Sequence, residues 1–415
     1  MDNAAILGWT LLWLVVWGAI GGIVTPRIYA RKDLDISDAP LGGAIVGAAF
    51  GPFGLIPLWI VTPGFSMRWL VAAGMVILAI IAFAFSKAYP TNLCVTDGSY
   101  VTSQLANGLV IGIIYSLMAL GLTLIFSILG VVSFAHGEFY MIGGYVVYVM
   151  STSAFAQDMS PLVWLLGAAV VTFVLGAIFE VFFLRVMGTG KIERPVEYAI
   201  LVTFGLSFFL QYLAQAIMGA SPVKAKRFWD FPVVALPSAE NPWFLKTTKG
   251  SLTLFEVIRI PNARFTSAVL AVILLLALMW FLYRTWQGRG LRAVSQDRQA
   301  ASVAGINPNN MNTLAFAMGA MLAGLSGASL VQVFSWLPQV GVPAAARSFV
   351  IIVLGGMGSL PGAFLGGLIV GVVETMGAGC VPDPSRAAAY MPAYGMIILT
   401  LTLLLKPTGL FGREL

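Results

Sequence analysis

The sequence predicts an all-α protein that crosses a lipid bilayer many times. Of its 415 residues, 59% are hydrophobic and only 10% are charged, whereas a soluble domain carries about 25% charged residues. Apolar runs of about 20 residues, each long enough to cross a hydrocarbon core of roughly 30 Å as a helix, follow one another along most of the chain. We therefore interpret the formal net charge of +6 as a sign of loop topology and not of nucleic-acid binding.

About eleven hydrophobic segments are expected from runs of this length bounded by charges or by Pro and Gly clusters. The first run is preceded by Asp2 and by no basic residue, so we expect a retained helix and not a cleaved signal peptide. In chain order the segments are 4–25, 41–62, 67–86, 104–127, 136–157, 162–184, 196–219, 265–284, 311–335, 346–378 and 389–406.

Two stretches are too long for a single crossing and are expected to contain breaks. A continuous helix from Asp97 to Asp158 would measure about 90 Å at 1.5 Å per residue, and LGVVSFAHGE, residues 129–138, interrupts it with glycine and polar residues. The sequence GGMGSLPG, Gly355 to Gly362, divides 346–378 into two half-helices. Irregular backbone at membrane depth is tolerated only where protein buries it or where it lines an aqueous cavity.

Basic loops set the expected orientation. Loops 185–195 and 284–310 are basic and are placed in the cytoplasm, with two spans between them. Loop 220–264 then lies outside, although it is basic too, and its Pro and aromatic content predicts a cap of short strands. Lys406 and Arg413 favour an internal C-terminus, which requires 346–378 to dip into the membrane and return.

The two cysteines are expected on the same side of the membrane, because loops 87–103 and 379–389 both face outside. Cys94 and Cys380 therefore share one oxidising compartment, and both a disulfide and two separate thiols agree with the spacing. With His136 as the single histidine, a structural zinc site of four Cys or His ligands cannot be assembled, and we expect no bound metal.

The polar stretch from Gly290 to Asn310 is too polar to cross the membrane and predicts a cytoplasmic amphipathic helix. Leu291, Val294, Ala301 and Gly305 recur on one side at steps of three or four residues, and Gly305, Asn307 and Pro308 form a stop signal. Such a helix either docks into a groove of a partner protein or lies as a connector at the lipid interface.

Four motifs resemble one family in the same order. QLANGLVIGIIYSLMALGLTLIFSILGVVSFAHGE, Gln104 to Glu138, followed by FYMIGGY, resembles the opening of permease subunits of branched-chain (hydrophobic) amino-acid ABC importers. LRAVSQDRQAASVAGIN resembles their coupling segment, VLGGMGSLPGAFLGGLIVGVVET resembles their C-terminal glycine-rich signature, and KPTGLFG is similar as well. The resemblance covers about 104–412 and implies a permease domain over 101–415, with an external loop 220–264 and a coupling segment 285–310.

The resemblance implies a subunit of an ATP-driven importer in the bacterial inner membrane. Such a permease pairs with a second permease subunit, homologous or identical, sits on two ATP-binding subunits and receives solute from a periplasmic substrate-binding protein. ATP and Mg are then bound by the partner subunits and no cofactor by this chain, which we expect not to be an enzyme. The nearest approach to an ATP-binding P-loop, GTGK, has Ile192 where Ser or Thr should hold magnesium. The residues implied in coupling are Leu291, Arg292, Ala293, Gln296, Asp297, Ala301, Gly305, Ile306 and Asn307.

Candidate residues of the solute path are polar or small residues on the spans and at the breaks: Asn107, Tyr115, His136, Glu138, Gly355, Gly356, Gly358 and Ser359. Ionisable groups at membrane depth are candidates for function, so His136 and Glu138 act either as a relay or gate, or as a structural pair that holds the first break. They are nearly the only ionisable residues expected deep in the bundle.

Three functions remain open on the sequence. Branched-chain amino acids are the expected solutes, and urea or short amides are the alternative within the same family. A gradient-driven secondary transporter or channel is a second alternative, which the scarcity of deep ionisable residues disfavours. Residues 1–100 depart from the family as an N-terminal extension of about three transmembrane helices, to which the sequence assigns no function.

Overall fold

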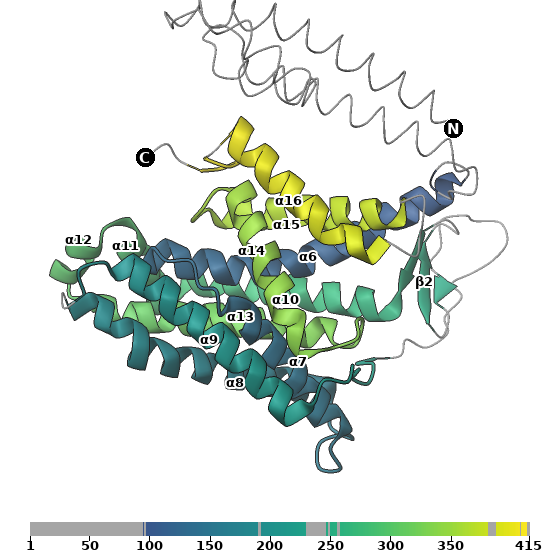
Figure 1. Cartoon of the computed structure of the whole chain (residues 1–415), viewed down its shortest axis with the longest axis horizontal. Helices are drawn as coiled ribbons and strands as arrows, with labels where there is room; N and C mark the ends of the chain where they lie inside the picture. The colour runs from purple at the N-terminus through teal and green to yellow at the C-terminus, as the bar shows by residue number, and fades with distance from the viewer. Residues whose placement is uncertain are drawn as a thin grey trace, which may run out of the picture. The chain divides into compact units, whose positions relative to one another are not determined.

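The computed structural model describes residues 94, 97–189, 192–229, 246–247, 250–254, 258–380, 387–406 and 408–412. The chain divides into two compact units, Met1–Ala82 and Phe83–Leu415. The first unit lies outside the described residues, and so do the predicted segments 4–25, 41–62 and 67–86. The second unit is mostly helical and carries one small antiparallel sheet (Figure 1).

The elements of the second unit alternate long helices with short turns. In chain order they are α6 (Gly98–Leu129), α7 (His136–Thr152), α8 (Pro161–Phe179), the π-helical turn η1 (Glu180–Leu184), the 3-10 turn η2 (Arg185–Thr189), α9 (Pro195–Met218), β1 (Lys246–Thr247), β2 (Ser251–Leu254), β3 (Ile258–Pro261), α10 (Asn262–Arg284), α11 (Trp286–Gln296), α12 (Arg298–Val303), α13 (Pro308–Leu330), the 3-10 turn η3 (Pro338–Val340), α14 (Gly341–Gly355), α15 (Leu360–Gly379) and α16 (Ala387–Leu405).

Within the described residues, seven helices are long and apolar enough to cross a membrane. They are Gly98–Leu129, Pro161–Met187, Pro195–Met218, Asn262–Arg284, Pro308–Leu330, Pro338–Gly355 and Leu360–Gly379. This agrees with a multi-pass membrane protein, whereas the total of about eleven hydrophobic segments remains a prediction.

Two helices, α6 and α13, form the centre of the bundle. In each of them 83% of the most apolar window is buried, against 6% in α9, which therefore presents most of its surface outward. Small residues allow the central helices to approach closely. A Cβ atom added to Gly143 of α7 would lie 2.0 Å from the carbonyl oxygen of Gly324 on α13, so a larger residue does not fit there.

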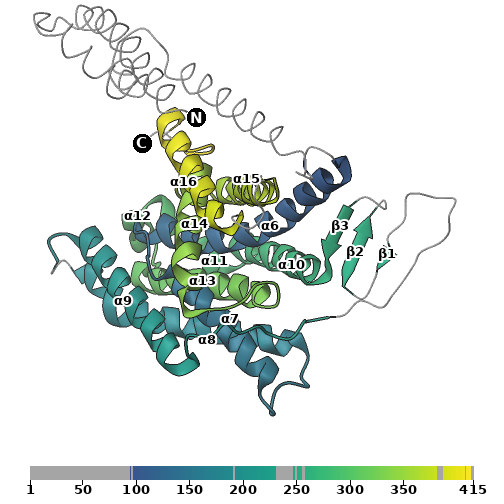
Figure 2. The same cartoon turned by 45° about the vertical axis from the view of Figure 1, so that its right-hand side comes forward.

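Both predicted breaks occur at the predicted residues. Helix α6 ends at Leu129, and Gly130 caps it in the left-handed conformation with φ 69° before α7 begins at His136. Helices α14 and α15 are separated by residues 356–359, where Gly356 and Gly358 have φ values of 100° and 85°. Helix α14 is steeply inclined to α6 and α10 in both views (Figures 1 and 2).

The C-terminal segment covers the second break. The backbone N–H of Leu410 donates to the carbonyl oxygen of Leu354 at 2.8 Å, and the N–H of Phe411 donates to that of Gly355 at 3.0 Å. These bonds satisfy carbonyl groups that a helix end leaves without intrahelical partners. The motif KPTGLFG therefore completes the turn between α14 and α15.

A three-stranded antiparallel sheet with the order β1-β2-β3 lies directly before α10 (Figure 2). The predicted cap of short strands in loop 220–264 is thus present over 246–261, while residues 230–245 lie outside the described part of the chain. Figure 1 shows the sheet and the α11–α12 pair at opposite ends of the second unit. This separation agrees with an outer position for the sheet and an inner position for the coupling segment.

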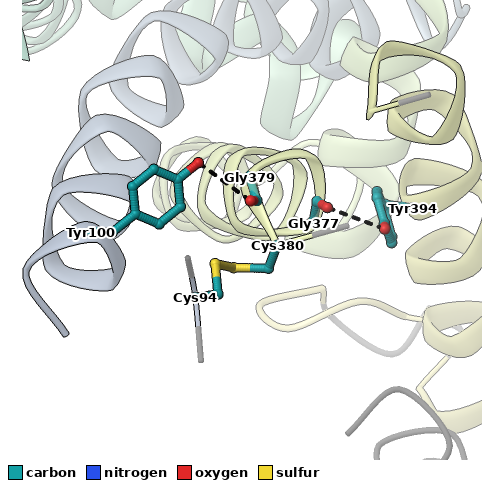
Figure 3. The surroundings of a disulfide bond; sticks show 6 residues. All are labelled: Cys94, Tyr100, Gly377, Gly379, Cys380 and Tyr394. Atoms are coloured by element: carbon teal, nitrogen blue, oxygen red, sulfur yellow. Dashed lines mark hydrogen bonds between the residues drawn. A yellow bond between two sulfur atoms is a disulfide. The ribbon is translucent and has the colours of Figure 1, made fainter. Parts of the chain in front are cut away.

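A disulfide joins Cys94 to Cys380, with 5.4 Å between the Cα atoms (Figure 3). Beside it, the Tyr100 hydroxyl donates to the carbonyl oxygen of Gly379 at 3.3 Å, and the Tyr394 hydroxyl donates to that of Gly377 at 3.3 Å. The residues before α6 and the end of α15 are therefore tied together. Of the two arrangements that the sequence left open, the structure has the disulfide.

Candidate functional site

An ion pair connects the two arms of the second broken segment. The Nε atom of Arg347 on α14 donates to both carboxylate oxygens of Glu374 on α15, each at 3.0 Å. The Glu374 side chain is 1% exposed, and that of Arg347 is 23% exposed. Sequence reasoning missed both residues because they were averaged into the apolar segment 346–378. Two opposite charges on either side of a glycine turn are the signal that could have revealed them.

Tyr115 of α6 packs against this ion pair. Its hydroxyl donates to Oε2 of Glu374 at 3.3 Å. The guanidinium carbon of Arg347 lies 5.6 Å from the centre of the Tyr115 ring, within cation-π distance. Tyr115, a predicted path residue, is thereby placed in a polar cluster among helices that are otherwise apolar.

Asn107 lies two turns before Tyr115 on α6 and holds a second arginine. Arg264 of α10 donates from Nη1 to Asn107 Oδ1 at 3.2 Å. The amide nitrogen of Asn107 donates to the carbonyl oxygens of Ser103 and Arg259 at 2.8 and 2.9 Å. Every polar atom of this amide therefore has a partner, which fixes the side chain toward α10. We call Asn107, Tyr115, Arg264, Arg347 and Glu374 the arginine cluster.

A polar pocket of about 480 Å³ lies at the outer end of α6, beside the sheet. Its acidic member is Asp97, which caps α6. The hydroxyl and the backbone N–H of Ser99 donate to the Asp97 carboxylate at 2.6 and 2.8 Å and hold its pKa below the usual range. The pocket thus carries both signs of charge. It is lined by Asp97, Ser99, Tyr100, Ser103, Gln104, Asn107, Ser251, Arg259, Pro261 and Arg264.

His136 and Glu138 are both fully buried, but they bond to different neighbours. The His136 Nε2 atom lies 2.9 Å from the carbonyl oxygen of Met118 on α6; because a carbonyl only accepts, Nε2 carries the proton. Glu138 Oε1 accepts from the Ser207 hydroxyl of α9 at 3.0 Å. The two side chains therefore do not form a pair, and each fastens the first turn of α7 to a different helix.

The remaining predicted path residues form the turn between α14 and α15. Ser359 caps α15 by accepting from the N–H of Gly362 at 3.2 Å. Gly355 packs against Gly362 of α15, and Gly356 packs against the C-terminal segment, since a Cβ atom on Gly356 would lie 2.4 Å from the backbone nitrogen of Gly412. At Gly358 a Cβ atom would meet nothing within 4 Å. The predicted path residues thus fall into three separate places, of which the arginine cluster is one.

The coupling segment consists of two helices, so the single helix predicted from sequence is wrong. Asp297, with an extended φ of −151°, ends α11 and caps α12, because its Oδ1 accepts from the N–H groups of Gln299 and Ala300 at 2.8 and 2.9 Å. Gly305 follows α12 with φ 85°, and Asn307 caps α13. The segment therefore contains two short helices that meet at Asp297.

The predicted coupling residues divide into packed and exposed groups. Leu291 and Ala301 are buried and attach the segment to the bundle, and Arg292 lies over the Tyr283 ring at 4.6 Å. The exposed residues are Gln296, Asp297, Gly305 and Asn307, whereas Ala293 and Ile306 are half-buried. Sequence reasoning missed Val303, which is 90% exposed at the end of α12.

A bundle with two broken helix pairs, a polar pocket at one end and an exposed helix pair at the other defines a multi-pass membrane transport protein. The family model described as branched-chain amino acid transport system / permease component matches residues 104–406. The chain belongs to this family of ABC transporter permeases. The first 103 residues lie outside the match.

Two permease relatives match over nearly their whole length. The high-affinity branched-chain amino acid transport system permease protein BraD of Pseudomonas aeruginosa is 34% identical over 316 residues, which are 75% of this chain and 95% of that protein. The permease protein LivH of Escherichia coli K12 is 31% identical over 325 residues, 76% of this chain and 96% of that protein. A shorter similarity, 37% over 122 residues, relates 28% of this chain to 34% of the fructose import permease FrcC of Rhizobium meliloti. No solved structure matches the chain.

Proposed function

We propose that this chain is the permease subunit of a bacterial inner-membrane ABC importer for branched-chain amino acids. The observation that carries the proposal is the family match over 104–406, together with relatives of at least 31% identity that are named as high-affinity branched-chain amino acid permeases. A second permease subunit, homologous or identical, completes the path. A periplasmic substrate-binding protein delivers solute at the end that carries the sheet.

The α11–α12 pair is the proposed docking element of this chain in a complex of two permeases and two ATP-binding subunits, and ATP and Mg are bound by the ATP-binding subunits. Buried Leu291 and Ala301 hold the pair to the bundle, while Val303 and the residues beside it are open to a partner. A displacement of the pair reaches α13 directly, because Asn307 caps that helix. Since α13 packs on α6, α7 and α8, one movement at the inner end repositions the centre of the bundle.

The two alternatives predict different driving forces or solutes. Arg264, Arg347 and Glu374 are ionisable residues within the spans that the sequence analysis did not count. The argument that ionisable residues are too scarce for a gradient-driven transporter therefore no longer holds. Family membership is what favours ATP-driven transport. A permease for urea or short amides differs only in the solute, which a transport assay identifies directly.

The test is purification of the chain from its native membrane in mild detergent, identification of its companions by mass spectrometry, and reconstitution of the complex with its binding protein in proteoliposomes. We expect two ATP-binding subunits, a second permease and ATP-dependent uptake of L-leucine. Uptake of urea without L-leucine would replace the solute. Uptake that follows a proton or sodium gradient in the absence of ATP, or a chain that is recovered alone, would overturn the proposal.

A further inference from the structure

We propose that the arginine cluster binds the carboxylate group of the transported solute, first at Arg264 in the outer pocket and then at Arg347 two helical turns deeper. The inference deepens the proposed function and rests on it, because an amino acid carries a carboxylate at neutral pH whereas urea and short amides carry none. The inference names the residues within the spans that bind the solute and the chemical group, a carboxylate, that they recognise.

The first argument is the charge of the cluster. The cluster contains two guanidinium groups, of Arg264 and Arg347, and one carboxylate, that of Glu374, which pairs with Arg347. Among the described residues, no carboxylate lies within ion-pair distance of Arg264. Charged side chains within membrane spans are costly unless they are paired. A solute carboxylate would supply the missing negative charge.

The second argument is the position of Arg264. Its Nη1 atom is held by Asn107, so the guanidinium group is oriented before any solute arrives, and the side chain lines the pocket of about 480 Å³. That volume lies within the range of small-molecule sites, roughly 300–1,000 Å³. Asp97 lines the same pocket. The opposite charges of Arg264 and Asp97 match the carboxylate and the ammonium group of an amino acid.

The third argument is the geometry of Arg347. Glu374 takes only its Nε atom, and the two terminal nitrogens donate to no residue in the described part of the chain. The Tyr115 ring supports the guanidinium plane from one side. A planar guanidinium with two free terminal nitrogens matches the geometry of a carboxylate. Glu374 is 1% exposed and Arg347 is 23% exposed, so the acid is the more deeply buried of the two, and neither terminal nitrogen of Arg347 is among the fully buried atoms without a partner.

The experiment measures ligand-dependent thermal stabilisation of the purified full-length chain in detergent. The probes are L-leucine, 4-methylpentanoate, which keeps the carboxylate and lacks the ammonium group, and 4-methylpentanamide, its neutral isostere. A ligand that binds the folded state raises the midpoint of unfolding in proportion to its affinity. We expect L-leucine and 4-methylpentanoate to raise the midpoint and the amide to have no effect.

Substitutions in α10 test whether Arg264 is responsible for the stabilisation by the carboxylate. Because a hydrogen bond to a charged group contributes roughly a tenfold change in affinity or more, Arg264→Gln should require about ten times more 4-methylpentanoate for the same shift. Arg264→Lys, which keeps the charge, should retain part of the response. Arg284→Gln removes an exposed arginine at the other end of α10 and should respond like the unaltered chain.

Equal stabilisation by the acid and the amide would overturn the inference, and so would a normal response of Arg264→Gln. If Arg264→Gln does not fold, which its elution in size exclusion reveals, the comparison of acid with amide on the unaltered chain still decides. Failure of the proposed function is visible separately. ATP-driven L-leucine uptake without any carboxylate preference in the binding assay would refute only the inference, and carboxylate binding without such uptake would refute only the importer assignment.

Discussion

Arg347 lies against the face of Tyr115, with its guanidinium carbon 5.6 Å from the ring centre. The two residues come from α14 and α6, so the contact joins the second broken segment to the central helix of the bundle. Glu374 closes the arrangement by accepting from both of them. Three helices are therefore connected at one point by charge, hydrogen bonding and ring contact.

Removal of the cation from this pair should destabilise the fold strongly. In Arg347→Gln, the Glu374 carboxylate, which is 1% exposed, would remain buried without its partner, and loss of one member of a buried pair costs about 3–5 kcal/mol. Arg194→Gln breaks the exposed pair with Glu197 and should cost at most about 1 kcal/mol. Unfolding of both purified variants, followed by circular dichroism, provides the comparison. Equal stability of the two would contradict a buried ion pair.

The disulfide should protect both cysteines from alkylation and should stabilise the fold. We expect alkylation without prior reduction to leave both Cys94 and Cys380 unmodified, and mass mapping should recover their two peptides as one linked species. Cys94→Ser together with Cys380→Ser should lower the free energy of unfolding by about 2–5 kcal/mol. Dithiothreitol should lower the unfolding temperature of the unaltered chain and leave that of the double variant unchanged. Full alkylation before reduction would show that the bond is absent.

An exposed apolar side chain at the end of α12 should matter for coupling and not for folding. Val303→Arg places a charge where Val303 is 90% exposed, and it should abolish ATP-driven uptake by the reconstituted complex while the chain folds normally. Val303→Thr, a substitution of similar shape, should retain most of the uptake. The readouts are uptake of L-leucine and recovery of ATP-binding subunits with the chain. Normal uptake by Val303→Arg would place the docking surface elsewhere.

Two glycines of the second break should differ in their tolerance of alanine. Both have positive φ, where the Cβ atom of alanine is strained; the cost is roughly 1–2 kcal/mol in the left-handed region, and Gly356, with φ 100° and ψ 117°, lies outside that region. At Gly358 nothing else opposes the Cβ atom, whereas at Gly356 it would lie 2.4 Å from the backbone nitrogen of Gly412. We expect Gly356→Ala to be clearly less stable than Gly358→Ala in thermal unfolding. Equal effects would mean that the C-terminal segment does not pack on this turn.

The positions of the helix breaks could be predicted from sequence, because glycine and polar residues interrupt apolar runs at 129–138 and at 355–362. The division of the coupling segment at Asp297 could not, since the apolar spacing continues across it. A side chain that bonds to the following N–H groups ends a helix without changing that spacing. The hydrogen bonds of the Asp297 side chain therefore determine where the helix ends, although the apolar periodicity predicts that it continues.

The site was only partly predictable, for two reasons of geometry. His136 and Glu138 were expected to act together because they are close in sequence, but residues two apart on a helix do not face each other. Arg347 and Glu374 are 27 residues apart and meet only because the chain reverses at the glycine turn. An average of hydrophobicity over 20 residues does not register a single charge in each arm.

The hydrogen bond from Leu410 to Leu354 can form only late in synthesis, because Leu410 follows α16 in the chain. Both arms of the α14–α15 hairpin leave the ribosome before α16 and the residues that cover their turn. The turn must therefore wait, with its carbonyl groups open, while α16 enters the membrane. Insertion of α16 and closure of the hairpin are thus coupled, and a fault in the first would leave the second incomplete.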